Sequence, residues 1–178
     1  YPFFFFLFLS CNTNVEKQSD LNIYRFENIL FNSNYENIEK NRNIWESEIG
    51  QFAPAYYSFL SVENDIDLIE SDLLSFVENS DMREVYDSIK VKFSTLERYE
   101  LEMSKAFKNF TNLFPQYNRP KLISMFSGFN YGVIVQDSIV AIGLDFYLGK
   151  NSVFYKRLGD PEYLKYQKQS RFLVPNVM

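Results

Sequence analysis

The chain has 178 residues, of which 46% are hydrophobic and 19% aromatic, enough to form one core of ordinary size. Its formal net charge of -5 leaves no basic stripe to neutralise phosphates, which argues against nucleic-acid binding and against an electrostatic lipid-surface patch. With no histidine and a single cysteine, these residues exclude a Ser-His-Asp triad, a Cys-His pair, a His-ligated metal and an internal disulfide.

The N-terminal segment 2–9 is continuously apolar but too short to span a bilayer, for which about 20 residues are needed. It has the length of a signal-peptide h-region, and Ser10-Cys11-Asn12 follows it directly. A small residue before a cysteine at this place is typical of a bacterial lipoprotein signal, so we predict that Cys11 carries lipid. The alternative is an ordinary signal, or a buried strand with an incidental cysteine.

These features predict three parts of the chain. Residues 1–11 form a lipoprotein signal peptide, incomplete at its N-terminus, that ends at the lipidation cysteine. Residues 12–20 are polar and lack aromatic side chains, which suits a solvated tether. Residues 21–178 form one domain, which we expect to continue beyond the last residue.

The first half of the domain has mainly helical patterns. Residues 22–27 alternate and predict a strand, and Ser33-x-x-Glu36 resembles a capping box that opens a helix ending at Gly50. Residues 51–57, which include Pro54, predict an aromatic-rich loop that either covers the core or forms an interaction surface.

Three further helices are predicted from apolar spacing and capping residues. The first runs from Ile66 to Val77, and Asp81 caps the second. The third opens at Ser94-x-x-Glu97 and stops at Phe114-Pro115.

Residues 120–155 are the most β-branched and apolar part of the domain. The runs 122–126, 133–136 and 139–144 predict three short strands, the last two joined by a tight hairpin at Asp137-Ser138. We therefore predict an α+β fold, in which helices are followed by a small antiparallel β-meander.

A carboxylate follows the last strand directly. Asp145 belongs either to a functional site or to a structural turn, and we expect it to cap the turn at Leu148-Gly149. Further on, Asp160-Pro161 predicts an N-cap followed by proline at the first position of a short helix.

The motif GLDFYLGKNSVFY at residues 143–155, with Asp160-Pro161-Glu162-Tyr163 and Val174-Pro175, resembles the core motif of the gliding motility lipoprotein GldB family of Bacteroidetes. Arg25-Phe26-Glu27 and Leu113-Phe114-Pro115 fall where that family has similar segments, although Glu27 stands where an aspartate is expected. The resemblance runs from about residue 20 to the end of the chain. It implies that the following motif residues build the fold or a partner surface: Asp145, Tyr147, Leu148, Gly149, Tyr155, Pro161 and Tyr163.

The resemblance also implies a function. It predicts a non-enzymatic, lipid-anchored cell-envelope protein that faces the periplasm and has an assembly or stabilising role in gliding motility. The expected partners are the membrane, reached through the lipid, and other proteins of the gliding or type IX secretion machinery; neither a cofactor nor nucleic acid is expected.

The residues also allow two enzymatic alternatives. The carboxylates Asp137, Asp145, Asp160 and Glu162 could in principle hydrolyse a glycosidic bond, but nothing in their spacing singles out a pair. The order of helices followed by strands is also that of a zincin-like peptidase, and the GldB family resembles zinc proteases with a degenerate metal-binding helix. The alternative function is therefore the N-terminal half of a membrane-anchored zincin-like metalloprotease, whose metal helix would lie beyond Met178.

Overall fold

The computed structural model describes residues 19–60 and 68–178. Within these ranges the sheet has four strands, β1 (Ile23–Arg25), β2 (Lys121–Met125), β3 (Val133–Gln136) and β4 (Ile139–Gly143). Their spatial order is β1-β2-β4-β3, with β1, β2 and β4 parallel and β3 antiparallel to β4. The predicted α+β class is confirmed. The predicted signal peptide with Cys11, most of the predicted tether and Ile66 lie outside the described residues.

The predicted antiparallel meander is wrong, because β2 pairs with β4 in parallel rather than with β3. Since β4 lies between β2 and β3, the chain that leaves β2 crosses the carboxyl end of β4 before it returns as β3. We call residues 126–132 the crossover loop. The hairpin at Asp137-Ser138 is confirmed, since β3 and β4 pair from Val133↔Ile142 to Gln136↔Ile139.

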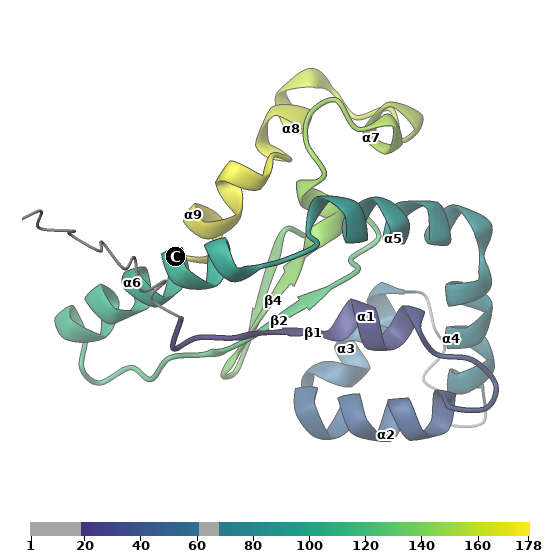
Figure 1. Cartoon of the computed structure of the whole chain (residues 1–178), viewed down its shortest axis with the longest axis horizontal. Helices are drawn as coiled ribbons and strands as arrows, with labels where there is room; N and C mark the ends of the chain where they lie inside the picture. The colour runs from purple at the N-terminus through teal and green to yellow at the C-terminus, as the bar shows by residue number, and fades with distance from the viewer. Residues whose placement is uncertain (1–18, 61–67) are drawn as a thin grey trace, which may run out of the picture.

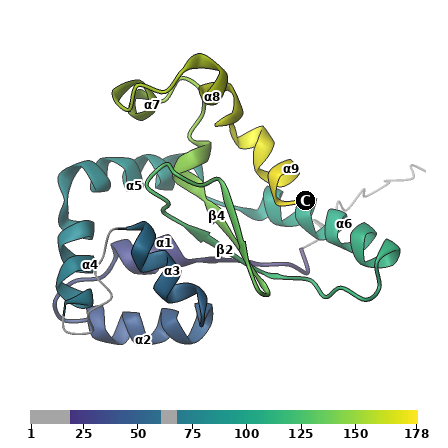
Figure 2. The same ribbon diagram turned by 180° about the vertical axis from the view of Figure 1, so that it is seen from behind.

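The helices are α1 (Phe26–Phe31), α2 (Ile38–Ile49), α3 (Phe52–Phe59), α4 (Ile69–Glu78), α5 (Ser80–Lys92), α6 (Glu97–Leu113), α7 (Val153–Arg157), α8 (Glu162–Gln167) and α9 (Leu173–Val177), with 3-10 turns η1 (Leu144–Tyr147) and η2 (Ser170–Phe172). Figure 1 shows α2 and α3 below the strands and α5 above them, and the reverse view in Figure 2 agrees. The segment 144–178, which we call the C-terminal arm, lies above α5 and returns to α6. None of the helices in the described ranges is long and apolar enough to cross a membrane.

One expected helix start and one expected loop on the N-terminal side are corrected. No capping box forms at Ser33, whose hydroxyl instead donates to the Ile29 carbonyl at 2.9 Å, and α2 begins only at Ile38. The predicted end at Gly50 is confirmed, where φ is 49°. The predicted loop at 51–57 is helix α3, because Pro54 lies in the first turn, where its missing N–H has no intrahelical acceptor.

The next three helices lie where apolar spacing placed them, with different caps. Helix α5 is capped by the side chain of Asn79, which accepts hydrogen bonds from the backbone N–H groups of Asp81 and Met82, so the predicted Asp81 cap is wrong. At the start of α6, the Thr95 hydroxyl accepts from the Glu97 N–H, where Ser94 was expected to cap. The end of α6 at Phe114 is confirmed.

The core is built largely from aromatic side chains around α1. Phe26 meets Trp45 of α2 edge-on at a centroid distance of 5.4 Å and Tyr56 of α3 at 4.8 Å. Phe31 stacks on Tyr86 of α5 at 4.3 Å. All five rings are almost fully buried, and each such pair adds about 0.5–1.5 kcal/mol beyond its area burial. Helix α1 therefore fixes α2, α3 and α5 around the start of the crossover loop.

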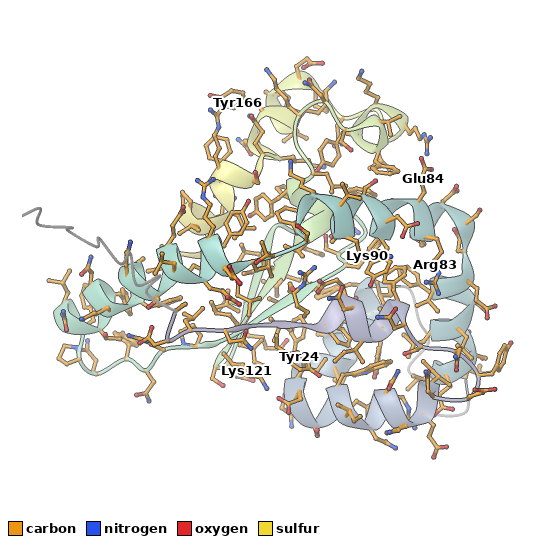
Figure 3. The ribbon with its side chains drawn as sticks, in the orientation of Figure 1. Tyr24, Arg83, Glu84, Lys90, Lys121 and Tyr166 are labelled. Atoms are coloured by element: carbon orange, nitrogen blue, oxygen red, sulfur yellow. The ribbon has the colours of Figure 1, made fainter. Side chains whose placement is uncertain are left out.

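Ion pairs attach the C-terminal arm to the domain and to itself. Glu84 of α5 points toward the arm in Figure 3, where its carboxylate pairs with Arg157 of α7 at 2.7 Å. Asp160 does not cap α8 as predicted; it pairs with Lys168 at 2.6 Å, and Pro161 takes the N-cap position. The Lys168 ammonium also lies 4.9 Å from the Phe146 ring and 4.8 Å from the Tyr155 ring, so this buried charge is compensated.

Candidate functional site

Two fully buried carboxylates lie at the carboxyl ends of the parallel strands. Glu27 follows β1 in α1, and Asp145 follows β4 in η1; both are 0% exposed. In sheets with parallel strands, ligands bind outside this edge, so it is the first place to look for a site. What decides between a binding role and an internal role is whether the carboxylate oxygens are free.

Asp145 is engaged by the crossover loop. Its Oδ1 accepts the backbone N–H of Ser127 at 2.8 Å, and its Oδ2 accepts the Ser127 hydroxyl at 3.0 Å and the backbone N–H of Phe129 at 2.5 Å. Burial raises the pKa of Asp145 to about 6, although these hydrogen bonds act in the opposite direction. The expectation that Asp145 caps the Leu148-Gly149 turn is wrong, because it holds the loop between β2 and β3 instead.

Close approach of the crossover loop explains the glycine at the end of β4. A Cβ on Gly143 would lie 2.1 Å from the Tyr131 carbonyl oxygen and 2.8 Å from the Ser127 hydroxyl. The loop also contains Gly128 and Phe129 with φ of 64°, a conformation that side chains disfavour. Asp145 bonds to Phe129 and thereby stabilises this strained turn over the strand end.

Glu27 is engaged in a second cluster on the other side of β2. Its Oε1 pairs with Arg25 Nε at 2.5 Å, and its Oε2 accepts the Ser124 hydroxyl at 2.7 Å. The same guanidinium donates to the Phe93 carbonyl at 2.8 Å. The Glu27 carboxylate therefore joins β1, β2 and the end of α5.

Tyrosine hydroxyls complete the polar contacts around the crossover loop and η1. Tyr56 of α3 donates to the Phe126 carbonyl at 3.0 Å. Tyr155 donates to the backbone carbonyl of Asp145 at 2.8 Å and accepts the Leu148 N–H at 2.9 Å. Burial raises the pKa of both hydroxyls, so they stay protonated and can act as donors.

The other motif residues are arranged along the C-terminal arm. Tyr147 is buried and accepts a hydrogen bond from the Asn176 side chain at 2.9 Å. The Gly149 N–H donates to the Lys168 carbonyl at 2.9 Å, at a φ of 105° that favours glycine. Leu148 is half-buried and bridges to Gln169, whereas Pro161 and Tyr163 are exposed on the arm.

A cavity of about 440 Å³ lies between the start of β3 and the C-terminal arm. It is lined by Gly132, Val133, Phe146, Tyr147, Gln167, Phe172 and Asn176. The Tyr147 hydroxyl and the Asn176 amide already bond to each other, and none of the lining residues in the described part of the chain is charged. It is thus a space beside the buried cluster, without an acid-base pair of its own.

The remaining candidate carboxylates are dispersed. Asp137 is in the hairpin turn at the opposite end of β4 from Asp145, with a φ of 52°. Glu162 is exposed and pairs with Lys165 at 2.5 Å. In the two described ranges no three His, Cys, Asp or Glu side chains gather as they would around a metal ion. The peptidase alternative stays a prediction, because it places the metal-binding helix beyond Met178.

Most partners of the two carboxylates were missed by sequence reasoning. One signal was available: Ser124 and Ser127 interrupt an apolar run, and a polar residue in a buried strand needs a partner. No local signal identified the hydrogen bond from Tyr56 to the Phe126 carbonyl, 70 residues away, or the one from Arg25 to the Phe93 carbonyl, 68 residues away.

These contacts define a class of protein: an α+β domain in which the carboxylates at the sheet edge are fully buried and hydrogen-bonded by the chain itself. A family comparison agrees with the motif resemblance. The chain belongs to the gliding motility protein GldB family, whose sequence profile matches residues 10–178. A search of curated proteins and a search of solved structures each found no match.

Proposed function

We propose that this chain is a non-enzymatic component of the gliding motility machinery, anchored to a cell-envelope membrane by lipid at Cys11. The domain faces the periplasm and binds other proteins of the gliding or type IX secretion apparatus. In this proposal Asp145, Tyr147 and Tyr155 maintain the fold, whereas Pro161 and Tyr163 belong to a partner surface.

The observation that carries the proposal is the family match, which spans residues 10–178 and so includes both Cys11 and the Asp145 motif. The geometry of Asp145 supports the non-enzymatic part. Its carboxylate is fully buried and accepts three hydrogen bonds from the chain, so a substrate would first have to displace the crossover loop.

Complementation of a gene deletion tests the proposal. Deletion in a gliding host should abolish colony spreading, and the wild-type gene should restore it. Asp145→Asn keeps the shape of the side chain but removes the carboxylate, and Tyr56→Phe is the matched control because it loses one hydrogen bond to the same loop. Spreading should follow the amount of folded protein in the envelope fraction, in the same way for both variants.

Two results would overturn the proposal. One is an Asp145→Asn protein present at the wild-type level that fails to restore spreading while Tyr56→Phe restores it, since this would assign chemistry to the carboxylate. The other is metal-dependent proteolysis by the purified full-length protein that is lost together with motility when its metal ligands are mutated.

A further inference from the structure

An exposed aromatic cluster lies at the end of α6 and in the loop that leads to β2. We call Phe110, Leu113, Phe114 and Tyr117 the aromatic tip. Leu113 is 75% exposed, Phe114 44% and Tyr117 57%. The Phe110 ring lies 5.1 Å from the Phe114 ring and 6.0 Å from the Tyr117 ring, so these side chains pack on one another at the surface. Contiguous exposed apolar groups of this kind mark a contact surface.

The surroundings of the aromatic tip are basic, although the chain as a whole is acidic. Residues 103–121 include four cations but no aspartate or glutamate. Two of the cations are paired with carboxylates from elsewhere in the chain, Arg119 with Asp20 and Lys121 with Glu48. Lys105 and Lys108 are exposed and form no ion pair within the described part of the chain. The net charge of -5 conceals these two exposed lysines beside the aromatic tip, whose positive charge is complementary to an anionic surface.

The predicted tether reaches the domain beside the aromatic tip. The Asp20 carboxylate accepts hydrogen bonds from the Ser104 hydroxyl of α6 and from Arg119 in the loop to β2, the latter at 2.9 Å. Figure 1 shows the described chain beginning alongside α6. Eight residues lie between Cys11 and Asp20, and the nine peptide steps span at most about 30 Å. A lipid on Cys11 would therefore keep the aromatic tip close to the bilayer.

We propose that the aromatic tip contacts the membrane, entering the headgroup region of an anionic bilayer and orienting the anchored domain. Tyr117 suits this region because its ring is apolar and its hydroxyl is polar, and the apolar side chains of Leu113 and Phe114 can enter the boundary between headgroups and acyl chains. The exposed lysines beside the aromatic tip are attracted to the negative surface of such a bilayer. This inference rests on the lipid anchor of the proposed function. Figure 1 places α2 and α4 at the other end of the long axis from the end of α6, so those helices would point away from the bilayer.

Tryptophan fluorescence on vesicles tests the contact. The chain has one tryptophan, Trp45, which is 0% exposed and gives a constant background. Phe114→Trp adds a reporter at the aromatic tip. Tyr35→Trp is the matched control, because Tyr35 is 78% exposed and lies in the link between α1 and α2 at the opposite end of the domain. Each full-length lipidated protein is reconstituted into vesicles of phosphatidylcholine and phosphatidylglycerol that carry brominated acyl chains.

The proposal predicts that most of the emission added by Phe114→Trp is quenched and that the emission added by Tyr35→Trp is not. Adding Lys105→Glu and Lys108→Glu to Phe114→Trp should reduce the quenching, with unchanged thermal unfolding as the check on folding. Protein that floats with the vesicles but shows equal, weak quenching at both positions would refute the membrane contact and leave the anchor intact. Wild-type lipidated protein that does not float would refute the anchor and this inference together.

Discussion

Replacing Asp145 by alanine tests the account of the crossover loop. The substitution leaves three donors without an acceptor: the buried N–H group and hydroxyl of Ser127, and the part-buried N–H group of Phe129. Each unsatisfied donor costs about 1–3 kcal/mol. The variant also gains stability, because it no longer buries an ionised carboxylate. Burial raises the pKa of Asp145 from 3.8 to about 6, and this pKa shift corresponds to roughly 3 kcal/mol of unfolding free energy at neutral pH. With the middle value of about 2 kcal/mol for each of the three donors, and roughly 3 kcal/mol regained from the carboxylate, the net destabilisation expected at neutral pH is roughly 3 kcal/mol.

The same carboxylate predicts a pH dependence of definite sign. Because the pKa of Asp145 is raised in the folded state, the folded protein binds this proton more tightly than the unfolded chain does. The contribution of Asp145 to stability is therefore greatest below the unfolded pKa and falls as pH rises through about 6. Between about pH 7.5 and pH 4.5, the unfolding free energy of the wild type should rise by roughly 2 kcal/mol relative to Asp145→Asn.

Urea unfolding followed by circular dichroism measures both effects, with m-values compared to check that the unfolding transition is unchanged. The matched control is Asp87→Ala, an exposed carboxylate that pairs only with Lys90, for which a change within about 0.5 kcal/mol is expected. A loss of less than about 1 kcal/mol in Asp145→Ala would show that the crossover loop does not depend on this side chain. If the difference in unfolding free energy between the wild type and Asp145→Asn does not vary with pH, the pKa of Asp145 is not raised.

Two further predictions concern the close approach at β4 and the C-terminal arm. Gly143→Ala should lower the unfolding free energy by about 3 kcal/mol or more, because the added Cβ would meet a backbone carbonyl. The control is Gly159→Ala, at φ 74° in open space, which should cost roughly 1 kcal/mol. Equal losses in urea unfolding would contradict the close approach of the crossover loop to β4. Lys168→Met should speed hydrogen exchange in the arm because it leaves the Asp160 carboxylate, only 17% exposed, without its cation. Lys165→Met is the control, because the carboxylate of its partner Glu162 is 88% exposed. If hydrogen exchange in the arm is equally fast in both variants, the Asp160–Lys168 pair does not hold the arm.

The strands could be predicted from the sequence, but their order could not. Each apolar run became a strand within one residue of its expected bounds, and the two-residue link at Asp137-Ser138 required β3 and β4 to pair. Nothing local specified whether β2 would pair with β3 or with β4, because the link at 127–132 is long enough for either a turn or a crossing. The order depends on contacts made after the chain has crossed, such as those of Asp145.

The candidate site was predicted in position but not in role. A carboxylate at the end of an apolar strand drew attention to Asp145, and the sequence suggested a partner only three or four residues away. The actual partners lie 16 and 18 residues earlier, because the crossing brings Ser127 and Phe129 over the end of β4. Helix α3 could not be predicted from proline alone, because Pro54 predicts a break in the middle of a helix but is tolerated in the first turn, where it lies.

The lipid anchor is the part of the account on which both the proposed function and the orientation of the domain depend. Its most direct test is a Cys11→Ala allele in the deletion strain, with acylation of wild-type Cys11 examined by mass spectrometry of the envelope protein. We predict an acylated wild-type cysteine, and a folded Cys11→Ala protein that leaves the membrane fraction and does not restore spreading. A Cys11→Ala protein that stays in the membrane fraction and restores spreading, with no acyl group on the wild type, would contradict the account.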